Sequence, residues 1–344
     1  MDREGAKEAY TREASELLQQ GTELVQKNWE ENEGEVKQVV FQALQQLLTC
    51  NKDKPEICYI QISLLRSQMD DDIYRMLLSL HDGTYFLDSD PRMQTADISS
   101  VFSPLRETRA RLYQAMDAYR GKIENFDADR MIRETAMAFY KKKADSCRML
   151  FRDLEQWRAE KGLMPWNRLT VKWGGYQEES ETVYLMDTGE KKQSQFLAYN
   201  ERNSISQWDP RYVYQSWETA SFADMEAEKM NLLFLVSRNC GMERCQWKGC
   251  MMHGGAFRGA KITETFFAGC DMSGCDFRDV EFSKVQFVQC NLMDADFTGA
   301  KFDMIQFPGS QMNNAKFSRD GICCNGLDAC QLQQIRLEEE PYVF

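Results

Sequence analysis

The C-terminal part of the sequence carries an apolar residue at every fifth position. From Met242 to Leu337, the twenty residues sampled at this step include no polar side chain, although only 43% of the chain is hydrophobic. A period of five matches neither the α-helix, at about 3.6 residues, nor the β-strand, at about 2. It is typical of a solenoid, in which each unit buries its apolar face by stacking on its neighbours.

The fifth positions define a predicted interior, with mostly small residues two places before them, as at Cys250, Gly255 and Ala260. A large side chain beside a small one fills a narrow tube without overlap. The predicted core consists of Met252, Phe257, Ile262, Phe267, Met272, Phe277, Phe282, Phe287, Leu292, Phe297, Phe302, Phe307, Met312 and Phe317.

A second period, of twenty residues, is superimposed on the first. One column, Met252, Met272, Leu292, Met312 and Leu332, has no aromatic residue, whereas the other three columns are rich in Phe. The small positions beside it agree, since they are Cys250, Cys270, Cys290, Ser310 and Cys330. This pattern predicts four units in each coil and a rod of four to five coils.

These units resemble the pentapeptide-repeat family, whose motif is a small residue, a polar residue, Leu or Phe, and two variable residues. Ala295-Asp296-Phe297 and Cys290-Asn291-Leu292 are typical. The resemblance covers roughly the last hundred residues and implies a right-handed quadrilateral β-helix. Some members of the family resemble duplex DNA in shape and charge and act on type II topoisomerases.

The rest of the chain is predicted to be an α+β arrangement in separate parts. We expect an α-rich domain with some β structure at residues 1–165, a β-hairpin connector and solenoid cap at 166–240, the β-helix at 241–337, and an acidic and apolar tail at 338–344. Cap residues at both ends follow from the need to cover a solenoid's open core.

Local patterns predict individual elements. Apolar stripes indicate helices at 5–31, 35–49, 103–122 and 127–161, with Asp127 as an N-cap. Strands are expected at 57–65, with a returning strand at Tyr85–Leu87, and in a hairpin of 169–173 and 182–186, while 73–80 fits helix or strand. A short helix at 222–229 is expected to lead into an apolar strand at 231–236.

Charge and cysteine content limit the function classes. The net charge of −12 disfavours binding to nucleic acid or anionic membranes. No signal peptide or apolar run of membrane-spanning length is recognised, so we expect a cytoplasmic protein with reduced cysteines. The resemblance to pentapeptide-repeat proteins implies a bacterial protein. Most of the twelve cysteines occupy small repeat positions, and no metal site or cofactor is expected.

Residues with catalytic potential are few. His81 precedes an Asp-Gly turn and is expected to be a solvated turn residue, and His253 is expected to point outward from the solenoid. The Lys141–Lys143 run is expected to be solvated, and the Cys323-Cys324 pair has few basic neighbours that would activate a thiol. We therefore expect no enzymatic activity.

An interaction or scaffold function remains as the leading hypothesis, with a protein partner. Four aromatic residues could form a partner surface or a core between domains: Trp208, Tyr212, Tyr214 and Trp217. DNA mimicry at a topoisomerase is one alternative, although residues 240–344 carry fourteen acidic and ten basic side chains, a net charge of only −4. An adaptor for a bacterial secretion or injection system is the other alternative.

Overall fold

The computed structural model describes residues 3–51, 54, 56–119, 121–200, 214–319 and 326–338. The chain forms two compact units, Met1–Tyr184 and Leu185–Phe344. Each unit has its own hydrophobic core, and we describe the two in turn.

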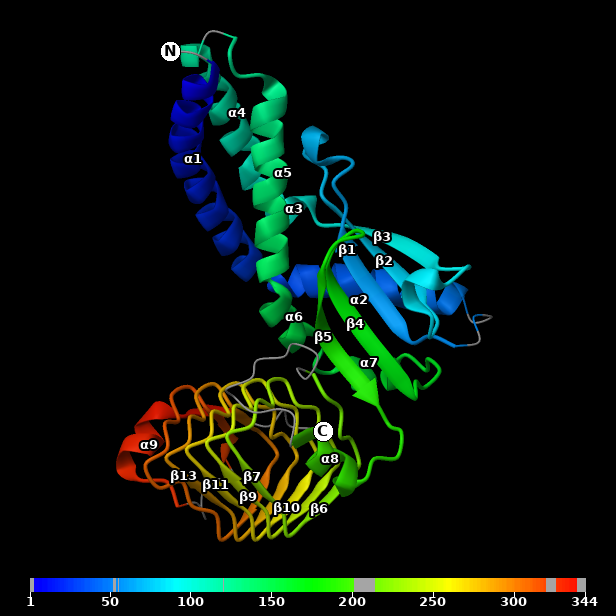
Figure 1. The fold of residues 1–344 in the computed structure, drawn as a ribbon, viewed down its shortest axis with the longest axis vertical. Helices are drawn as coiled ribbons and strands as arrows, with labels where there is room; N and C mark the ends of the chain where they lie inside the picture. The colour runs from blue at the N-terminus through cyan, green and yellow to red at the C-terminus, as the bar shows by residue number, and fades with distance from the viewer. Residues whose placement is uncertain are drawn as a thin grey trace. The chain divides into compact units, whose positions relative to one another are not determined.

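The first unit combines helices with a five-stranded sheet of order β3-β2-β1-β4-β5 (Figure 1). Strand β2 is antiparallel to β1 and β3, and β1 is parallel to β4. The strands are β1 (Tyr59–Leu64), β2 (Arg75–His81), β3 (Arg92–Asp97), β4 (Arg168–Gly175) and β5 (Ser180–Asp187). The helices are α1 (Arg3–Glu31), α2 (Glu33–Cys50), α3 (Ser99–Phe102), α4 (Pro104–Met116), α5 (Asn125–Lys142), α6 (Ala144–Phe151) and α7 (Leu154–Glu160), with 3-10 turns η1 (Met69–Asp71), η2 (Tyr85–Leu87) and η3 (Asp117–Tyr119).

The core of this unit lies between one face of the sheet and the helices. Successive side chains of a strand point to opposite faces, so in β1 the apolar Ile60 and Ile62 lie on one face and the polar Gln61 and Ser63, also buried, lie on the other. Helix α2 packs on β2 and β3, and α5 and α6 pack on β4. The Trp173 indole donates a hydrogen bond to the Tyr140 carbonyl oxygen at 2.9 Å.

The first two helices, the strand at 57–65 and the hairpin β4–β5 are confirmed, and 73–80 is the strand β2. The returning strand predicted at Tyr85–Leu87 is wrong. These residues form η2, where Tyr85 has a left-handed φ of 55°, and the returning strand is β3. The hairpin lies in the sheet of this unit.

The single helix predicted over 127–161 is also wrong, because α5, α6 and α7 divide this stretch. Its N-cap is Glu124, and Asp127 is instead the third residue of a capping box. The break after α5 falls at Lys143, which is buried rather than solvated. Its ammonium group lies over the rings of Phe139, at 5.0 Å, and Trp29, at 5.5 Å.

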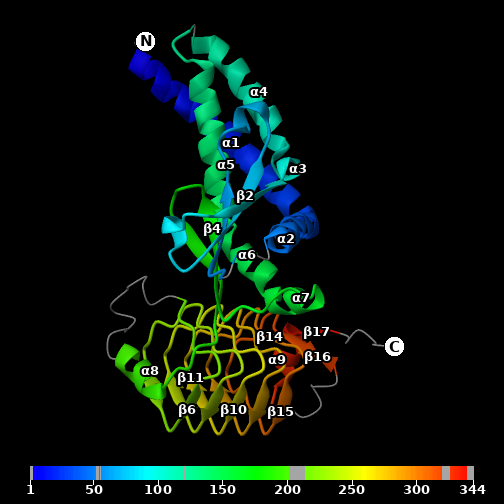
Figure 2. The ribbon, with the colours of Figure 1, turned by 90° about the vertical axis from the view of Figure 1, so that its right-hand side faces the viewer.

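The second unit is a β-solenoid of about six coils. Its strands are only two or three residues long and form parallel sheets along the walls of the rod (Figures 1 and 2). They are β6 (Ser221–Ala223), β7 (Glu226–Glu228), β8 (Gly241–Glu243), β9 (Gln246–Lys248), β10 (Lys261–Thr263), β11 (Phe266–Ala268), β12 (Glu281–Ser283), β13 (Gln286–Val288), β14 (Asp296–Phe297), β15 (Lys301–Asp303), β16 (Lys316–Ser318) and β17 (Arg336–Glu338).

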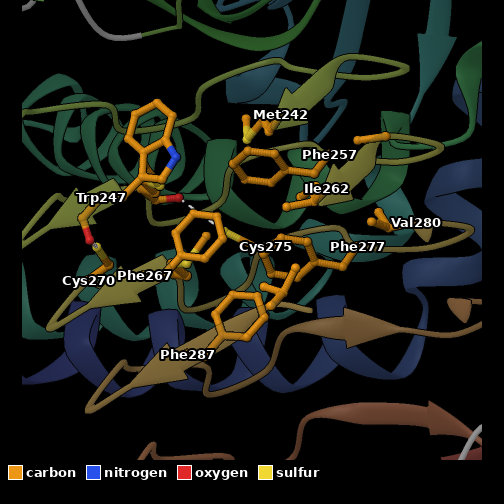
Figure 3. Packing of buried hydrophobic residues seen from close by; sticks show 14 of the residues in the cluster. Met242, Trp247, Phe257, Ile262, Phe267, Cys270, Cys275, Phe277, Val280 and Phe287 are labelled. Atoms are coloured by element: carbon orange, nitrogen blue, oxygen red, sulfur yellow. Dashed lines mark hydrogen bonds between the residues drawn. The ribbon is translucent and has the colours of Figure 1, made fainter. Parts of the chain in front are cut away.

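The twenty-residue register is confirmed in the pairing of these strands. Ile262 pairs with Phe282, and Phe267 with Phe287. The aromatic rings stack accordingly, with Phe267 and Phe287 centroids 4.9 Å apart and planes 5° apart (Figure 3). Asp271 and Asn291 form a parallel β-bridge, so their neighbours Met272 and Leu292 also lie on one wall. All the predicted core positions are buried except Phe302, which is partly buried.

The solenoid begins earlier than the five-residue pattern predicts, since Ser216 already pairs with Val236. The helix predicted at 222–229 is therefore wrong, and β6 and β7 occupy that stretch. Here the central positions include the small Ala227 and Ser237, and larger buried residues, Met225 and Leu235, stand two places before them. This exchange of large and small side chains fills the tube but hides the pattern.

Short helices close the core at both ends. Phe196 of α8 (Gln193–Asn200) packs edge-on against Trp217 and Phe222, with both centroid distances 5.0 Å. At the other end, Gln331 of α9 (Ala329–Gln334) donates hydrogen bonds to the carbonyl oxygens of Phe307 and Ser310. The prediction that Leu332 and Cys330 continue the columns is wrong, because both lie exposed in α9. Residues 339–344 of the predicted tail lie outside the described range.

Candidate interaction surface

The walls of the solenoid differ in chemistry although they share one core. In each three-residue strand the central side chain points inward, and its two neighbours point outward. The residue after each of the strands β6 to β13 and β15 forms a corner with left-handed φ, as at Arg244 (52°) and Lys284 (54°). Every coil therefore presents two wall positions and one corner position per side, and residues twenty apart align along the rod.

One wall, which we name the charge-ladder face, carries β6, β8, β10, β12 and β15. Glu281 lies between two lysines one coil away on either side, 3.4 Å from Lys261 and 3.1 Å from Lys301. At the adjoining corner, Lys284 contacts Glu264 at 2.8 Å. These lysines hold the pKa values of Glu281 and Glu264 below their usual range. Apart from Asp303, which accepts a hydrogen bond from Ser283, the described charges on this wall thus pair with one another within the molecule.

The adjacent wall carries β7, β9, β11 and β13 (Figure 1) and has a charge-free centre. Glu226, Glu228 and Lys248 are charged at its N-terminal end. Beyond them, six outward residues are uncharged and lie half-buried or exposed, and we name them the uncharged face: Phe266, Ala268, Gln286, Val288, Gln306 and Pro308. Their only described side-chain hydrogen bond joins Gln286 to Gln306, at 3.1 Å.

Two features make the uncharged face flat and firm. From β9 onward, the corner residues of this wall are Gly249, Gly269, Gln289 and Gly309, all with left-handed φ, so a corner side chain rises beside these strands only at Gln289. Beneath it, Phe267, Phe287 and Phe307 form a fully buried stack with ring distances of 4.9 and 5.4 Å. A close-packed support of this kind resists deformation when a partner docks.

The aromatic residues predicted as a partner surface do not form one group in the described part of the chain. Trp217 is buried in the solenoid core beside Phe196. Tyr214 is half-buried and stacks on Phe234, with centroids 4.9 Å apart. Trp208 and Tyr212 lie outside the described residues, so their role stays a prediction. The five-residue pattern does not predict the uncharged face. The face can be recognised from the residues on either side of each core position when they are compared at intervals of twenty.

The two histidines occupy different environments. His253 is exposed as predicted, and its Nδ1 lies 2.9 Å from the Ser273 hydroxyl. The prediction for His81 is wrong, since it is the last residue of β2 and is buried, with Nε2 2.9 Å from Ser79 Oγ. Burial lowers the pKa of His81. This Ser–His pair is closed from solvent on a sheet face, where a substrate has no described route to it.

The cysteine column of the solenoid is buried as predicted. Cys250, Cys270 and Cys290 are each about 1% exposed. Burial keeps the three thiols from solvent, and the slow alkylation expected of all three stays a prediction for experiment. Cys323 and Cys324 lie outside the described residues. Among described residues, no three His, Cys, Asp or Glu side chains are grouped as metal ligands, and no helix is long and apolar enough to cross a membrane.

Comparison with known protein families identifies the type of repeat in the solenoid. The family model for the pentapeptide repeat region matches residues 240–317, and no curated protein matches the chain. Similar solved structures include QnrB1, a plasmid-mediated fluoroquinolone resistance protein (12% identity, 38% of this chain and 86% of that chain, TM-score 0.19). A second is a pentapeptide repeat protein of the Arabidopsis thaliana thylakoid lumen (22% identity, 32% of this chain and 71% of that chain, TM-score 0.18). A third is HetL from Nostoc sp. strain PCC 7120, involved in heterocyst differentiation regulation (10% identity, 43% of this chain and 78% of that chain, TM-score 0.25). Because these TM-scores are low, the assignment rests on the family model and the register.

Proposed function

We propose that this chain, whose residues 240–317 are a pentapeptide-repeat region, is a non-enzymatic scaffold that binds a protein partner on the uncharged face. The supporting observation is the contrast between two walls on one core. The charge-ladder face pairs its charges internally, at 3.1 and 3.4 Å around Glu281, whereas the uncharged face leaves Phe266 and Val288 toward solvent. Packing of the core requires neither arrangement, and we take the difference as support for docking on the uncharged face.

The composition of the uncharged face suits the centre of a protein interface. Such centres are depleted of charged residues and enriched in aromatic ones, and polar groups surround them. Here Phe266 and Val288 supply apolar area, and Lys248 and Gln289 lie at the border. Because the wall is a rigid parallel sheet, docking costs little conformational entropy on this side.

The charge ladder argues against DNA mimicry at a topoisomerase. A duplex presents phosphates of one sign at regular spacing, whereas Lys261, Glu281 and Lys301 alternate in sign along the rod. Inhibition of gyrase supercoiling by sub-micromolar protein would revive that alternative. The hypothesis of an adaptor for a secretion or injection system stays a prediction about which partner is bound.

A cytoplasmic location is part of the proposal. The cysteines in the described residues are free, and their burial in the solenoid suits a reducing compartment. Cell fractionation tests this placement, and recovery in an oxidising compartment would contradict it.

A matched pair of variants tests the docking proposal. Val288→Lys places a charge on the uncharged face, and Thr263→Lys places one at the equivalent position of the charge-ladder face, where both residues are half-buried and β-branched. Affinity capture from native lysate with each full-length variant, quantified by mass spectrometry, should show specific proteins lost by about tenfold or more with Val288→Lys. The same proteins should remain with Thr263→Lys.

Equal thermal stability of the two variants is the necessary control. Identical capture by both variants, or no protein captured specifically by the wild type, would refute docking on this face.

A further inference from the structure

A groove in the N-terminal unit lies at the carboxyl ends of two parallel strands. Leu64, the last residue of β1, lines it, and so does Tyr176, the residue after β4. Strands β1 and β4 are neighbours, and the sheet continues from this pair to β2 and β3 on one side and to β5 on the other. In open sheets covered by helices, the crevice outside the carboxyl ends of such strands is a common place for a ligand.

The groove presents apolar and aromatic surface to solvent. Leu64 and Leu65 contribute aliphatic side chains from the end of β1. Phe126 of α5 is 62% exposed, and Tyr176 of the β4–β5 turn is 45% exposed. The Arg133 guanidinium lies over the Phe126 ring, 5.5 Å from its centroid, and so restricts the orientation of that ring. The groove thus offers two aromatic rings against which a planar group can pack.

An ion-pair network ties three walls of the groove to one another. Glu178 of the β4–β5 turn contacts Arg66 of the β1–β2 loop at 2.6 Å and Lys141 of α5 at 2.7 Å. The Glu178 carboxylate lies against Gly175, where a Cβ would be 2.6 Å from Oε2. The groove is therefore formed in the free protein, and a ligand needs to order little of it on binding.

The charged side chains of the groove limit the charge that a ligand can bring. Arg66 and Lys141 share Glu178, and Arg133 pairs with Asp70 Oδ1, so an anion would have to compete with these carboxylates for each described base. The Asp70 side chain is 56% exposed, and no described hydrogen bond or ion pair involves its Oδ2. This oxygen is an acceptor that a donor on a ligand can reach.

We propose that the groove binds a small uncharged molecule with a planar aromatic ring and a hydrogen-bond donor, of the indole or phenol class. The ring packs against Phe126 and Tyr176, and the donor bonds to Asp70. The volume of the groove, about 670 Å³, lies within the range of small-molecule sites, roughly 300–1,000 Å³. The proposal is independent of the docking proposed for the solenoid.

Three related probes test the chemistry of the site. Indole and 1-methylindole share one uncharged ring system, but only indole can donate a hydrogen bond. Isothermal titration calorimetry with the full-length chain should show saturable 1:1 binding of indole and about tenfold weaker binding of 1-methylindole, because one hydrogen bond to a charged acceptor is lost. Asp70→Ala should remove this preference. Indole-3-carboxylate, which is an anion, should also bind about tenfold more weakly than indole.

A pair of surface variants tests the location. Phe126→Ala removes one of the two rings and should weaken indole binding about tenfold. Met164→Ala is the matched control, since Met164 is an apolar residue, 79% exposed, outside the groove, and it should bind indole like the wild type. No saturable binding of indole to the wild type, equal affinity for indole and 1-methylindole, tighter binding of indole-3-carboxylate than of indole, or unchanged indole binding by Phe126→Ala would each overturn the proposal.

Discussion

In the solenoid from Trp247 to Phe317, each aromatic ring of the core contacts a ring one coil away, as Phe287 does with Phe267 at 4.9 Å and Phe307 at 5.4 Å. In the N-terminal unit the contacts follow no constant spacing, since Tyr59 of β1 pairs with His81 and with Thr170. The solenoid core is mainly apolar or thiol, with a few hydroxyl residues such as Ser237 and Thr265, whereas the N-terminal unit uses buried charges such as Arg109 to hold its loops. Because the solenoid core repeats, the outward residues of its walls can vary without loss of packing. The core of the N-terminal unit depends instead on individual polar residues.

The largest effect of a single substitution is expected in the repeat core. Phe287→Ala leaves a gap between two stacked rings and should lower the free energy of unfolding of the solenoid by about 3–5 kcal/mol. Phe126→Ala, at a residue 62% exposed, should cost less than about 0.5 kcal/mol. Urea unfolding of both variants measures the difference, and similar losses would show that the solenoid is not close-packed.

The second largest loss of stability is expected from removing the buried Arg109 of the N-terminal unit. The Arg109 guanidinium contacts Asp72 at 2.6 Å and Asp129 at 3.3 Å, and donates to the Met69 carbonyl oxygen at 2.6 Å. Arg109→Met leaves Asp129 without this cation and Asp72 with Arg106 alone, at 3.2 Å, and should cost about 3 kcal/mol. Hydrogen exchange should report the loss in η1 and α4 and leave the solenoid protected. Faster exchange throughout the solenoid would contradict the independence of the two cores.

The loop at Asp88 should give a pH-dependent effect. Burial raises the pKa of this carboxyl, but the bonds from Lys54 and from the Asp90 and Asp82 backbones outweigh it and lower the pKa to about 2. The stabilisation is therefore present at neutral pH and is lost as pH falls from about 3.8 toward 2. Asp88→Asn should lose about 2 kcal/mol at pH 7.

The difference between Asp88→Asn and the wild type should shrink as the solution approaches pH 2. Thermal unfolding across this range measures it. A constant difference at every pH would show that the charge of Asp88 contributes nothing.

The smallest effect is expected on the charge-ladder face. Lys284→Glu places a second acid beside Glu264, yet both positions are exposed, so thermal stability should not change measurably. The pKa of Glu264, which Lys284 now holds down, should rise when followed by NMR. A large loss of stability would mean that the ladder, rather than the core, holds the coils together.

How far the sequence could predict these two regions depends on the spacing of contacts. The core from Met252 to Phe317 and its walls could be predicted because each core residue meets one twenty positions away. The first coils could not be predicted, because there the large residues, Met225 and Leu235, stand at the positions that are small elsewhere, and the small residues, Ala227 and Ser237, stand at the central positions. The burial of His81 and Lys143 could not either, because it depends on residues distant in sequence, such as Trp29 beside Lys143.

The candidate surface could have been predicted in part. Phe266 and Val288 belong to one wall by the twenty-residue period alone, and their lack of charge is plain in the sequence. The internal pairing of Glu281 with two lysines needed the structure, because it depends on side-chain reach across coils. Without that pairing, the contrast between the walls carries no functional meaning.

The twenty-residue register is tested most directly by a pair of deletions. Removing residues 261–280 takes out one whole coil and joins Ala260 to Glu281 in register, as the pairing of Lys261 with Glu281 requires. Removing only 261–265 shifts every later residue by one wall and mismatches the aromatic columns and the charge ladder. Thermal unfolding should show the longer deletion to be the more stable protein. Equal stability, or greater stability of the shorter deletion, would contradict the register on which both walls depend.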